Sequence, residues 1–283
     1  MVFNTLPCYY GGVARKAEDT MVEKKKKKKA AGSYQYLTVI SFFAIIIFWC
    51  VFTYGGFVSS LFVPSPTEVI EALVKTAKDG SLWQDCYISI KRVMIGWFWS
   101  AVVALPCGML MARSGKFRAI IQPIIEFARY LPVVALVPLT ILYLGVDETP
   151  KYVIIWLGTF FQLVLMIADT VSAVDKNMLN AARTLGANRL QVYTQVIFPA
   201  SLPGFMDNFR LTIGWAWTYL VVAEMVAAGS GLGYTILKSQ RFMATDVIFG
   251  GLIMIGVIGL VTDLLMRILT RLVVPWHERL GDS

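Results

Sequence analysis

The chain has 283 residues, of which 57% are hydrophobic and only 16% are charged. A soluble domain carries about a quarter charged residues, and the apolar residues here come in long runs, so the composition indicates an integral membrane protein. The net charge of +8 at pH 7 does not indicate nucleic-acid binding, because much of it comes from one lysine run, Lys24–Lys29, and no basic stripe is interleaved with aromatic residues.

Residues 1–35 are polar, small and basic, and we expect them to form a disordered tail. They contain no apolar core, so they are not a secretory signal peptide. The lysines precede the first apolar segment and favour a cytoplasmic N-terminus. Met21 is an alternative start of translation, a hypothesis that an intact-mass measurement detecting residues 1–20 would reject.

Six apolar segments follow the tail, each close to the ~20 residues that an α-helix needs to span a bilayer. They are Leu37–Phe57, Val93–Ala112, Ile120–Leu144, Tyr152–Val171, Phe209–Ala228 and Val247–Leu269. The sequence therefore predicts an all-α integral membrane protein with six transmembrane helices. The expected organisation is a tail (1–35), a first helix with an outer amphipathic helix (36–87), a transmembrane domain (88–274) and a cytoplasmic tail (275–283).

The outer loop after the first span predicts a short amphipathic helix. Ser65 and Glu68 match a capping box, and Pro66 occupies the first helical position. Gly80 is expected to end the helix. Its predicted apolar face consists of Val69, Ile70, Leu73 and Val74.

Charge placement orients the predicted spans. With both ends in the cytoplasm, most of the 26 Lys and Arg residues fall on the inner side, as the positive-inside rule requires. Lys91 and Arg92 are then assigned to the outer side. The polar segment Asn180–Pro199 is assigned to the cytoplasm.

The segment Asn180–Pro199 predicts two short helices around a turn at residues 186–188, with Pro199 ending the second. Small residues and the glycine would let another protein approach the backbone closely. The apolar residues of the two helices are Ala181, Ala182, Leu185, Val192, Val196 and Ile197.

The same segment resembles the cytoplasmic signature of binding-protein-dependent ABC importer permeases, E-A-A-x3-G-x9-I-x-L-P. The spacing is kept, with Asn, Val and Phe in place of Glu, Ile and Leu. The matching residues are Asn180, Ala181, Ala182, Gly186, Val196, Phe198 and Pro199. The resemblance implies a coupling loop (172–207) that docks into a groove on an ATP-binding subunit. An ordinary amphipathic loop is the alternative.

Further stretches of sequence resemble the nitrate/sulfonate/bicarbonate/taurine branch of these permeases, and the resemblance covers roughly residues 60–275. It includes PSPTEVIEAL in the outer loop, Ser89–Gly96, Ala128–Leu139 and Gly214–Ala228. The resemblance implies a type I ABC importer permease fold, multi-pass in the inner membrane, and a dimer with itself or with a sister permease. Implied partners are ATPase subunits, a solute-binding protein and membrane lipid, and the implied cargo is nitrate, bicarbonate, cyanate or a sulfonate such as taurine.

Charges inside the predicted spans are candidates for function, because each costs about 2.5–3.5 kcal/mol on insertion scales unless it is paired or hydrated. They are Glu126, Arg129, Asp169, Glu224 and Asp263. Glu126 and Arg129 are three residues apart on one helix, so they can form an ion pair, or Arg129 can face a passing anion. Pro132 and Pro138 remove backbone donors and predict an unwound helix, which makes Arg129–Pro132 a candidate part of the pathway wall.

Glu224 has two interpretations, a hydrogen-bonded residue that joins two helices or a gate in the pathway. Gly229, Gly231 and Gly233 lack the strand–loop–helix context of a nucleotide site, and the chain contains no G-x4-G-K-[ST] motif.

No enzyme chemistry is expected. His277 is the single histidine, and the four cysteines, Cys8, Cys50, Cys86 and Cys107, are scattered without a C-x-x-C motif. We therefore expect no catalytic residues, no metal and no cofactor. The rival transport class is a stand-alone secondary transporter or channel, which would need ion-coupling residues and usually an inverted repeat. Neither is visible in the sequence.

Overall fold

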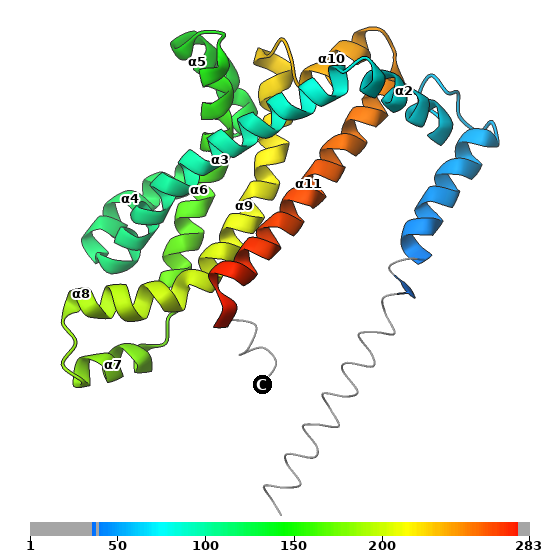
Figure 1. Ribbon diagram of the computed structural model, residues 1–283. Helices are drawn as coiled ribbons and strands as arrows, with labels where there is room; N and C mark the ends of the chain where they lie inside the picture. Colours follow the sequence, from blue (N-terminus) through cyan, green and yellow to red (C-terminus); the bar gives the residue numbers. More distant parts are fainter. Residues whose placement is uncertain (1–35, 38–39, 277–283) are drawn as a thin grey trace, which may run out of the picture. The chain divides into compact units, whose positions relative to one another are not determined.

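The computed structural model describes residues 36–37 and 40–276, and all regular structure in these residues is helical. The predictions for the basic tail, Cys8 and His277 therefore fall outside the described residues. Two compact units, 1–66 and 67–283, are described separately. The α-helices of the second unit, labelled in Figure 1, are α2 (Pro66–Lys78), α3 (Ser81–Arg113), α4 (Gly115–Ala128), α5 (Val133–Leu144), α6 (Glu148–Ser172), α7 (Lys176–Thr184), α8 (Arg189–Gln191), α9 (Phe198–Ala227), α10 (Leu232–Arg241) and α11 (Thr245–Val273). The π-helix η1 (Val192–Ile197) connects α8 and α9.

The first unit contains one apolar helix, Ile40–Tyr54, within the first predicted span. The rings of Phe48 and Phe52 stack on it, with centroids 5.5 Å apart. After the helix the chain turns back, and the Trp49 indole N–H donates a hydrogen bond to the Pro64 carbonyl over 3.1 Å.

The second unit is built on α3, α6 and α9, which pack along one another. Glycines explain how closely α3 approaches α6, because a Cβ at Gly96 would lie 2.7 Å from the Ile155 Cβ and one at Gly108 would lie 2.7 Å from the Val164 carbonyl oxygen. Small residues at such positions let two membrane helices pack backbone to backbone.

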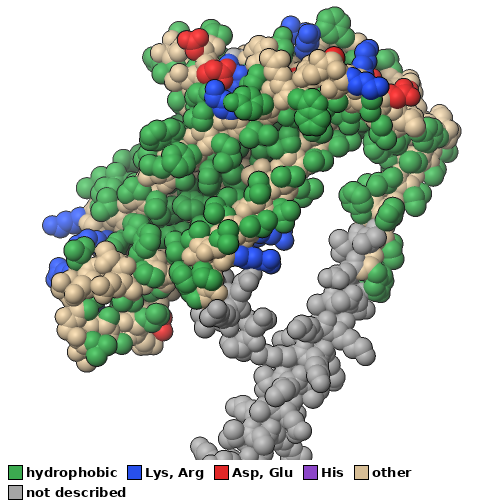
Figure 2. Space-filling model, in the orientation of Figure 1, with side chains coloured by type: hydrophobic (Ala, Val, Ile, Leu, Met, Phe, Trp, Pro, Cys, Tyr) green, Lys and Arg blue, Asp and Glu red, His purple; other side chains and the backbone are tan. Residues whose placement is uncertain are grey.

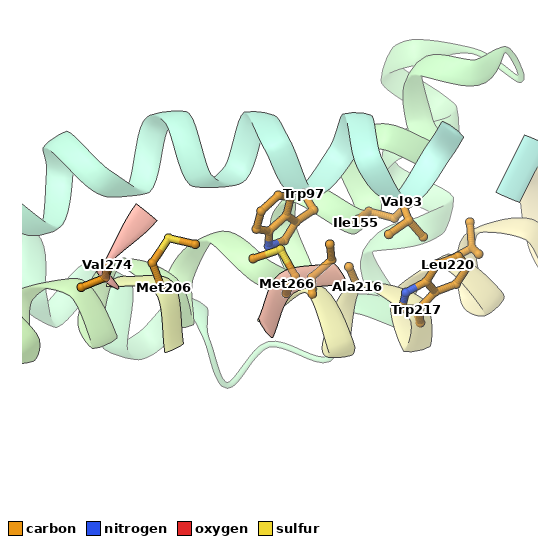
Figure 3. Packing of buried hydrophobic residues seen from close by; sticks show 10 residues of the cluster. Val93, Trp97, Ile155, Met206, Ala216, Trp217, Leu220, Met266 and Val274 are labelled. Carbon is orange, nitrogen blue, oxygen red and sulfur yellow. The ribbon is translucent and has the colours of Figure 1, made fainter. Parts of the chain in front are cut away.

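A buried cluster joins four of the helices. Figure 3 shows Trp97 of α3, Ile155 of α6, Ala216 of α9 and Met266 of α11 meeting between the helices. The Trp97 indole N–H donates to the Thr212 hydroxyl over 3.1 Å, so the one polar atom of this large ring is satisfied.

Each predicted span falls on a helix, although the third is not a single helix. Among the described residues, α3, α6 and α11 are long and apolar enough to cross a membrane, and α4 with α5 is a fourth candidate if the bent pair is one span. Those two helices are bent by 99° at residues 129–132. The break agrees with the predicted interruption at Pro132, the N-cap of α5, because the residue before a proline avoids the α conformation; Pro138, the other predicted interruption, lies inside α5.

The outer amphipathic helix α2 begins at Pro66, as predicted, but its buried face is different. Val69 and Ala72 are buried, whereas Ile70 and Val74 of the predicted apolar face are exposed. Leu73 lies against Gly250 of α11, where a Cβ would be 3.2 Å from the leucine side chain.

The surface matches a membrane environment. Figure 2 shows hydrophobic side chains over the middle of the helices, with Lys, Arg, Asp and Glu gathered toward the two ends. On α11 the exposed residues include Leu252, Leu260, Leu264 and Leu272. An exposed apolar surface of this extent would be unfavourable in water and is satisfied by lipid or a partner subunit.

Candidate functional site

The predicted coupling loop (172–207), called the coupling segment below, contains two short helices, α7 and α8, joined by a tight turn. After α7, the Gly186 N–H donates to the Arg183 carbonyl and the Ala187 N–H to the Ala182 carbonyl, each over 3.0 Å. This hydrogen-bond pair is a Schellman motif, in which the residue after the helix takes the left-handed conformation. Gly186 has φ +85°, which explains why glycine stands there.

The second helix of the segment starts with a complete capping box. The Asn188 side chain accepts from the Gln191 N–H, and the Gln191 side chain accepts from the Asn188 N–H, each over 2.8 Å. Such reciprocal caps satisfy backbone donors at the helix start. The turn is therefore held by its own hydrogen bonds and presents a defined shape.

Several apolar side chains of the coupling segment are exposed on the surface. Leu185 is 88% exposed, Leu190 is 65% exposed and Met178 is 50% exposed. Figure 1 shows α7 and α8 at the end of the bundle opposite α5 and α10. Of the signature residues, Asn180, Ala181 and Gly186 are exposed, while Ala182, Val196, Phe198 and Pro199 are half-buried.

The prediction that Pro199 ends the second helix is wrong. Pro199 lies in the first turn of α9, which continues directly from η1. Proline has no N–H to donate, and the wider π-turn before it lets the chain continue without a break. The Phe198 N–H accordingly bonds five residues back, to the Tyr193 carbonyl.

Tyr193 ties the π-helix to the transmembrane bundle. Its hydroxyl donates to the Met109 carbonyl of α3 over 2.8 Å, and the Arg113 guanidinium lies 5.4 Å from the centre of its ring. Burial raises the pKa of the Tyr193 hydroxyl, an effect that the nearby Arg113 partly offsets, so the group stays a donor at neutral pH.

A cavity of about 290 Å³ adjoins the break between α4 and α5. Arg129 and Leu131 of the break line it, together with residues from α6 and α9. Pro132 is not among its lining residues. The other lining residues are Ala128, Val133, Leu136, Leu157, Gly158, Phe161, Gln162, Trp215 and Tyr219.

Arg129 has no carboxylate partner among the described residues. Its guanidinium donates to the Tyr130 hydroxyl over 2.9 Å and lies 4.8 Å from the centre of that ring. The predicted ion pair with Glu126 is not formed: the Glu126 carboxylate accepts from the Gln122 amide over 2.7 Å instead. Arg129 is the C-cap of α4 and keeps the αR conformation, with its N–H bonded to the Ile125 carbonyl, so the helical spacing is kept and the two side chains bond other partners.

Glu224 lies in a buried ion-pair cluster that we define as Ser89, Arg92, Glu148, Lys151 and Glu224. The Arg92 and Glu224 side chains are 1% and 0% exposed and are joined over 2.8 Å. Arg92 also reaches Glu148 over 2.6 and 2.7 Å, and Lys151 reaches Glu148 over 2.7 Å. The Ser89 hydroxyl donates to Glu224 over 2.8 Å.

The loop between α9 and α10 closes over this cluster. The Gly233 N–H donates to Glu224 over 2.8 Å, and the Ser230 carbonyl accepts from Arg92 over 2.7 Å. A Cβ at Gly231, which has φ +109°, would lie 2.3 Å from the Glu224 carboxylate. The glycines thus let the backbone approach a buried carboxylate, a use unrelated to nucleotides. Of the two interpretations of Glu224, this geometry matches the residue that joins helices.

Sequence reasoning missed Arg92, which it assigned to the outer side. The residue lies inside α3, and its partner Glu224 is 132 positions away in the sequence. A local signal existed: Ser89, Arg92, Val93 and Gly96 recur at helical spacing, and all four are buried. This pattern marks Arg92 as part of a buried face.

Asp263 is also paired. Its carboxylate accepts from the Arg267 side chain over 2.9 Å and from the Arg210 side chain of α9 over 3.1 Å. In the part of the chain that the structure describes, no group of three or more His, Cys, Asp or Glu residues is placed to hold a metal ion.

Comparison with known proteins places this arrangement in a family. The sequence model of the family described as "Binding-protein-dependent transport system inner membrane component" matches residues 104–277. A probable ABC transporter permease protein of Brucella abortus (strain 2308) is 37% identical over 243 residues, which are 86% of this chain and 96% of the relative. The taurine transport system permease protein TauC of Escherichia coli (strain K12) is 36% identical over 225 residues, which are 78% of this chain and 82% of TauC.

A solved structure shows the same fold. An inward-facing structure of the MetNI methionine ABC transporter is similar with a TM-score of 0.62 at 18% sequence identity, over 70% of this chain and 98% of the solved chain. This similarity confirms the expected type I ABC importer permease fold. The chain therefore belongs to the membrane-embedded, binding-protein-dependent ABC transporter permeases, in the branch of the nitrate, sulfonate and taurine permeases.

Proposed function

We propose that this chain forms the membrane pathway of an ATP-driven importer for a small oxyanion, namely nitrate, bicarbonate, cyanate or a sulfonate such as taurine. A solute-binding protein delivers the anion, and a separate subunit hydrolyses ATP. The observation that carries the proposal is Arg129, a cation without a carboxylate partner among the described residues, at a cavity beside a broken helix. Non-helical backbone at membrane depth is tolerated where it lines such a cavity.

The coupling segment binds the ATPase subunit. The contact residues are the exposed or half-buried residues of the signature: Asn180, Ala181, Ala182, Gly186, Val196, Phe198 and Pro199. The exposed Leu185 and Leu190 support this assignment, because large apolar side chains on a polar segment mark interaction surfaces. Tyr193 then links the bound segment to α3.

The importer contains two permeases, this chain with itself or with a sister chain, above two ATPase subunits in the inner membrane. The coupling segment faces the cytoplasm. The end of α11 lies at the same end of the bundle as α7 and α8, which supports a cytoplasmic C-terminus (Figure 1). The N-terminus is assigned to the same side by the lysine run alone.

Transport follows from a two-state equilibrium. ATP binding favours one state of the ATPase pair. The coupling segment transmits this conformational change to η1 and α9. The loaded binding protein shifts the same equilibrium from the outer side. Such ligands shift populations only to the extent that they bind the two states differently. Arg129 offers the anion its positive charge as the pathway changes sides.

Uptake by a strain that lacks the gene tests the proposal. Loss of uptake of one anion among nitrate, bicarbonate, cyanate, taurine and a long-chain sulfonate, with recovery on complementation, supports it. Arg129→Gln should lower that uptake with assembly preserved, and Arg129→Lys should retain more of it. Uptake that persists without the ATPase gene would instead indicate a stand-alone transporter, and full uptake by Arg129→Gln would refute the role of Arg129.

A further inference from the structure

The cavity beside Arg129 lies at the break between α4 and α5 and near the middle of α6. α6 contributes two pairs of lining residues at i, i+4 spacing, Leu157 with Phe161 and Gly158 with Gln162, all near the middle of this 25-residue helix. α9 contributes Trp215 and Tyr219, again four residues apart. One face of each helix is therefore turned toward the cavity.

The charged side chain in the cavity lining is positive, and no negative side chain accompanies it. Arg129 supplies a positive charge and Gln162 an amide, whereas none of the lining residues is Asp or Glu. An anionic headgroup finds charge-assisted donors here, and Arg is suited to planar or tetrahedral oxyanions. An ammonium group finds no carboxylate among the lining residues, so a zwitterion would bury its positive charge without a partner.

The remaining wall is apolar and aromatic, formed mainly by Leu131, Val133, Leu136, Phe161, Trp215 and Tyr219. The volume of about 290 Å³ is close to the lower end of the range for small-molecule pockets, about 300–1,000 Å³. An inorganic anion such as nitrate would leave most of this wall facing water. An apolar or aromatic body would cover it.

We propose that the cavity accommodates an organic monoanion, with its sulfonate or carboxylate on Arg129 and its uncharged body against Trp215 and Tyr219. This inference rests on the proposed import function and narrows it. It favours such anions over inorganic oxyanions and over zwitterions such as taurine.

Gly158 is the positioning residue for the aromatic wall. A Cβ at this position would lie 2.3 Å from the Tyr219 ring, so the absence of a side chain lets the ring lie against α6. Alanine there would displace the ring and alter the room available to a bulky body. The headgroup site at Arg129 would keep its charge.

The test measures uptake ratios in cells that express the complete transporter. The probes are labelled benzenesulfonate, methanesulfonate, nitrate and taurine. The binding protein is the same in every strain, so a change in the ratio between two probes reports on the permease. Gly158→Ala should lower benzenesulfonate uptake about tenfold relative to methanesulfonate, a size typical for a changed apolar pocket. Gly259→Ala is the control, because a Cβ there meets nothing within 4 Å.

A second variant guards against misfolding. Trp215 is 40% exposed, so Trp215→Ala should assemble and should show the same selective loss. An unchanged ratio in both variants would overturn the inference. So would a wild-type transporter that imports nitrate or taurine but neither simple sulfonate, although the proposed function would then stand. Import of none of the four probes would overturn the inference, and the same cells tested with bicarbonate, cyanate and a long-chain sulfonate would then decide the proposed function separately.

Discussion

Removing Arg92 should destabilise the protein by about 3–5 kcal/mol, the usual cost of leaving one partner of a buried ion pair alone. The structure favours the lower end of that range. In Arg92→Met, Glu224 keeps its hydrogen bonds from Ser89 and from the Gly233 N–H. Those bonds compensate part of the charge, whereas Glu148 is about half exposed and can turn to water and to Lys151.

Glu224→Met should cost less than Arg92→Met. Arg92 would still have both Glu148 oxygens and the Ser230 carbonyl, so its charge stays paired. The double variant Arg92→Met/Glu224→Met should lose less unfolding free energy than the two single variants lose together, by at least ~2 kcal/mol. The reason is that the double variant leaves neither of the two charges buried without its partner.

Unfolding of the detergent-solubilised protein by SDS, followed by circular dichroism, gives the free energies for this cycle. Arg267→Met provides the control, since it removes an exposed arginine from a salt bridge and should cost no more than about 1 kcal/mol. A loss below about 1 kcal/mol for Arg92→Met, or strict additivity in the double variant, would refute the assignment of a tightly coupled buried pair.

Two further predictions concern glycines. Gly186→Pro should abolish ATPase pull-down while membrane insertion stays intact, because proline cannot adopt φ +85° or donate the Gly186 N–H bond; unchanged pull-down would count against the docking assignment. Gly96→Ala should lower the stability by about 1–3 kcal/mol in the same SDS titration, since its Cβ would overlap Ile155. Gly256→Ala, which meets nothing within 4 Å, should be neutral or slightly stabilising, and equal effects of the two alanines would contradict the packing argument.

The sequence was most informative where a property is local. Apolar run length predicted where the spans lie, and turn chemistry predicted the bend at Gly186. Local signals did not give the angle between α4 and α5 or the continuation of the helix past Pro199. A proline shows that a helix is disturbed there, but the surrounding packing decides whether the chain bends by 99° or passes through a π-turn.

Pairing between distant residues was the other limit. Arg92 looks like an ordinary positive charge at the outer end of a helix, and nothing near it in the sequence names Glu224 or the Ser230 carbonyl. Glu126 and Arg129 show the opposite error, because helical spacing allows a pair but does not decide which partner each side chain takes. Arg129 keeps the helical backbone as the C-cap of α4, yet its guanidinium bonds the Tyr130 hydroxyl and the Glu126 carboxylate bonds the Gln122 amide.

Glu224 and Arg129 differ in burial and in bonding, and this difference distinguishes them as candidates for contact with a transported molecule. Glu224 is fully buried and receives hydrogen bonds from a guanidinium, a hydroxyl and a backbone N–H. A carboxylate with this many donors has little left to offer a cargo, and its neighbours hold the α9–α10 loop against α3. Arg129 is exposed, and among the described residues its side-chain partner is the adjacent tyrosine. Because guanidinium has five N–H donors, most of its capacity stays available to an anion, and that surplus makes Arg129 the stronger candidate for contact with the transported molecule.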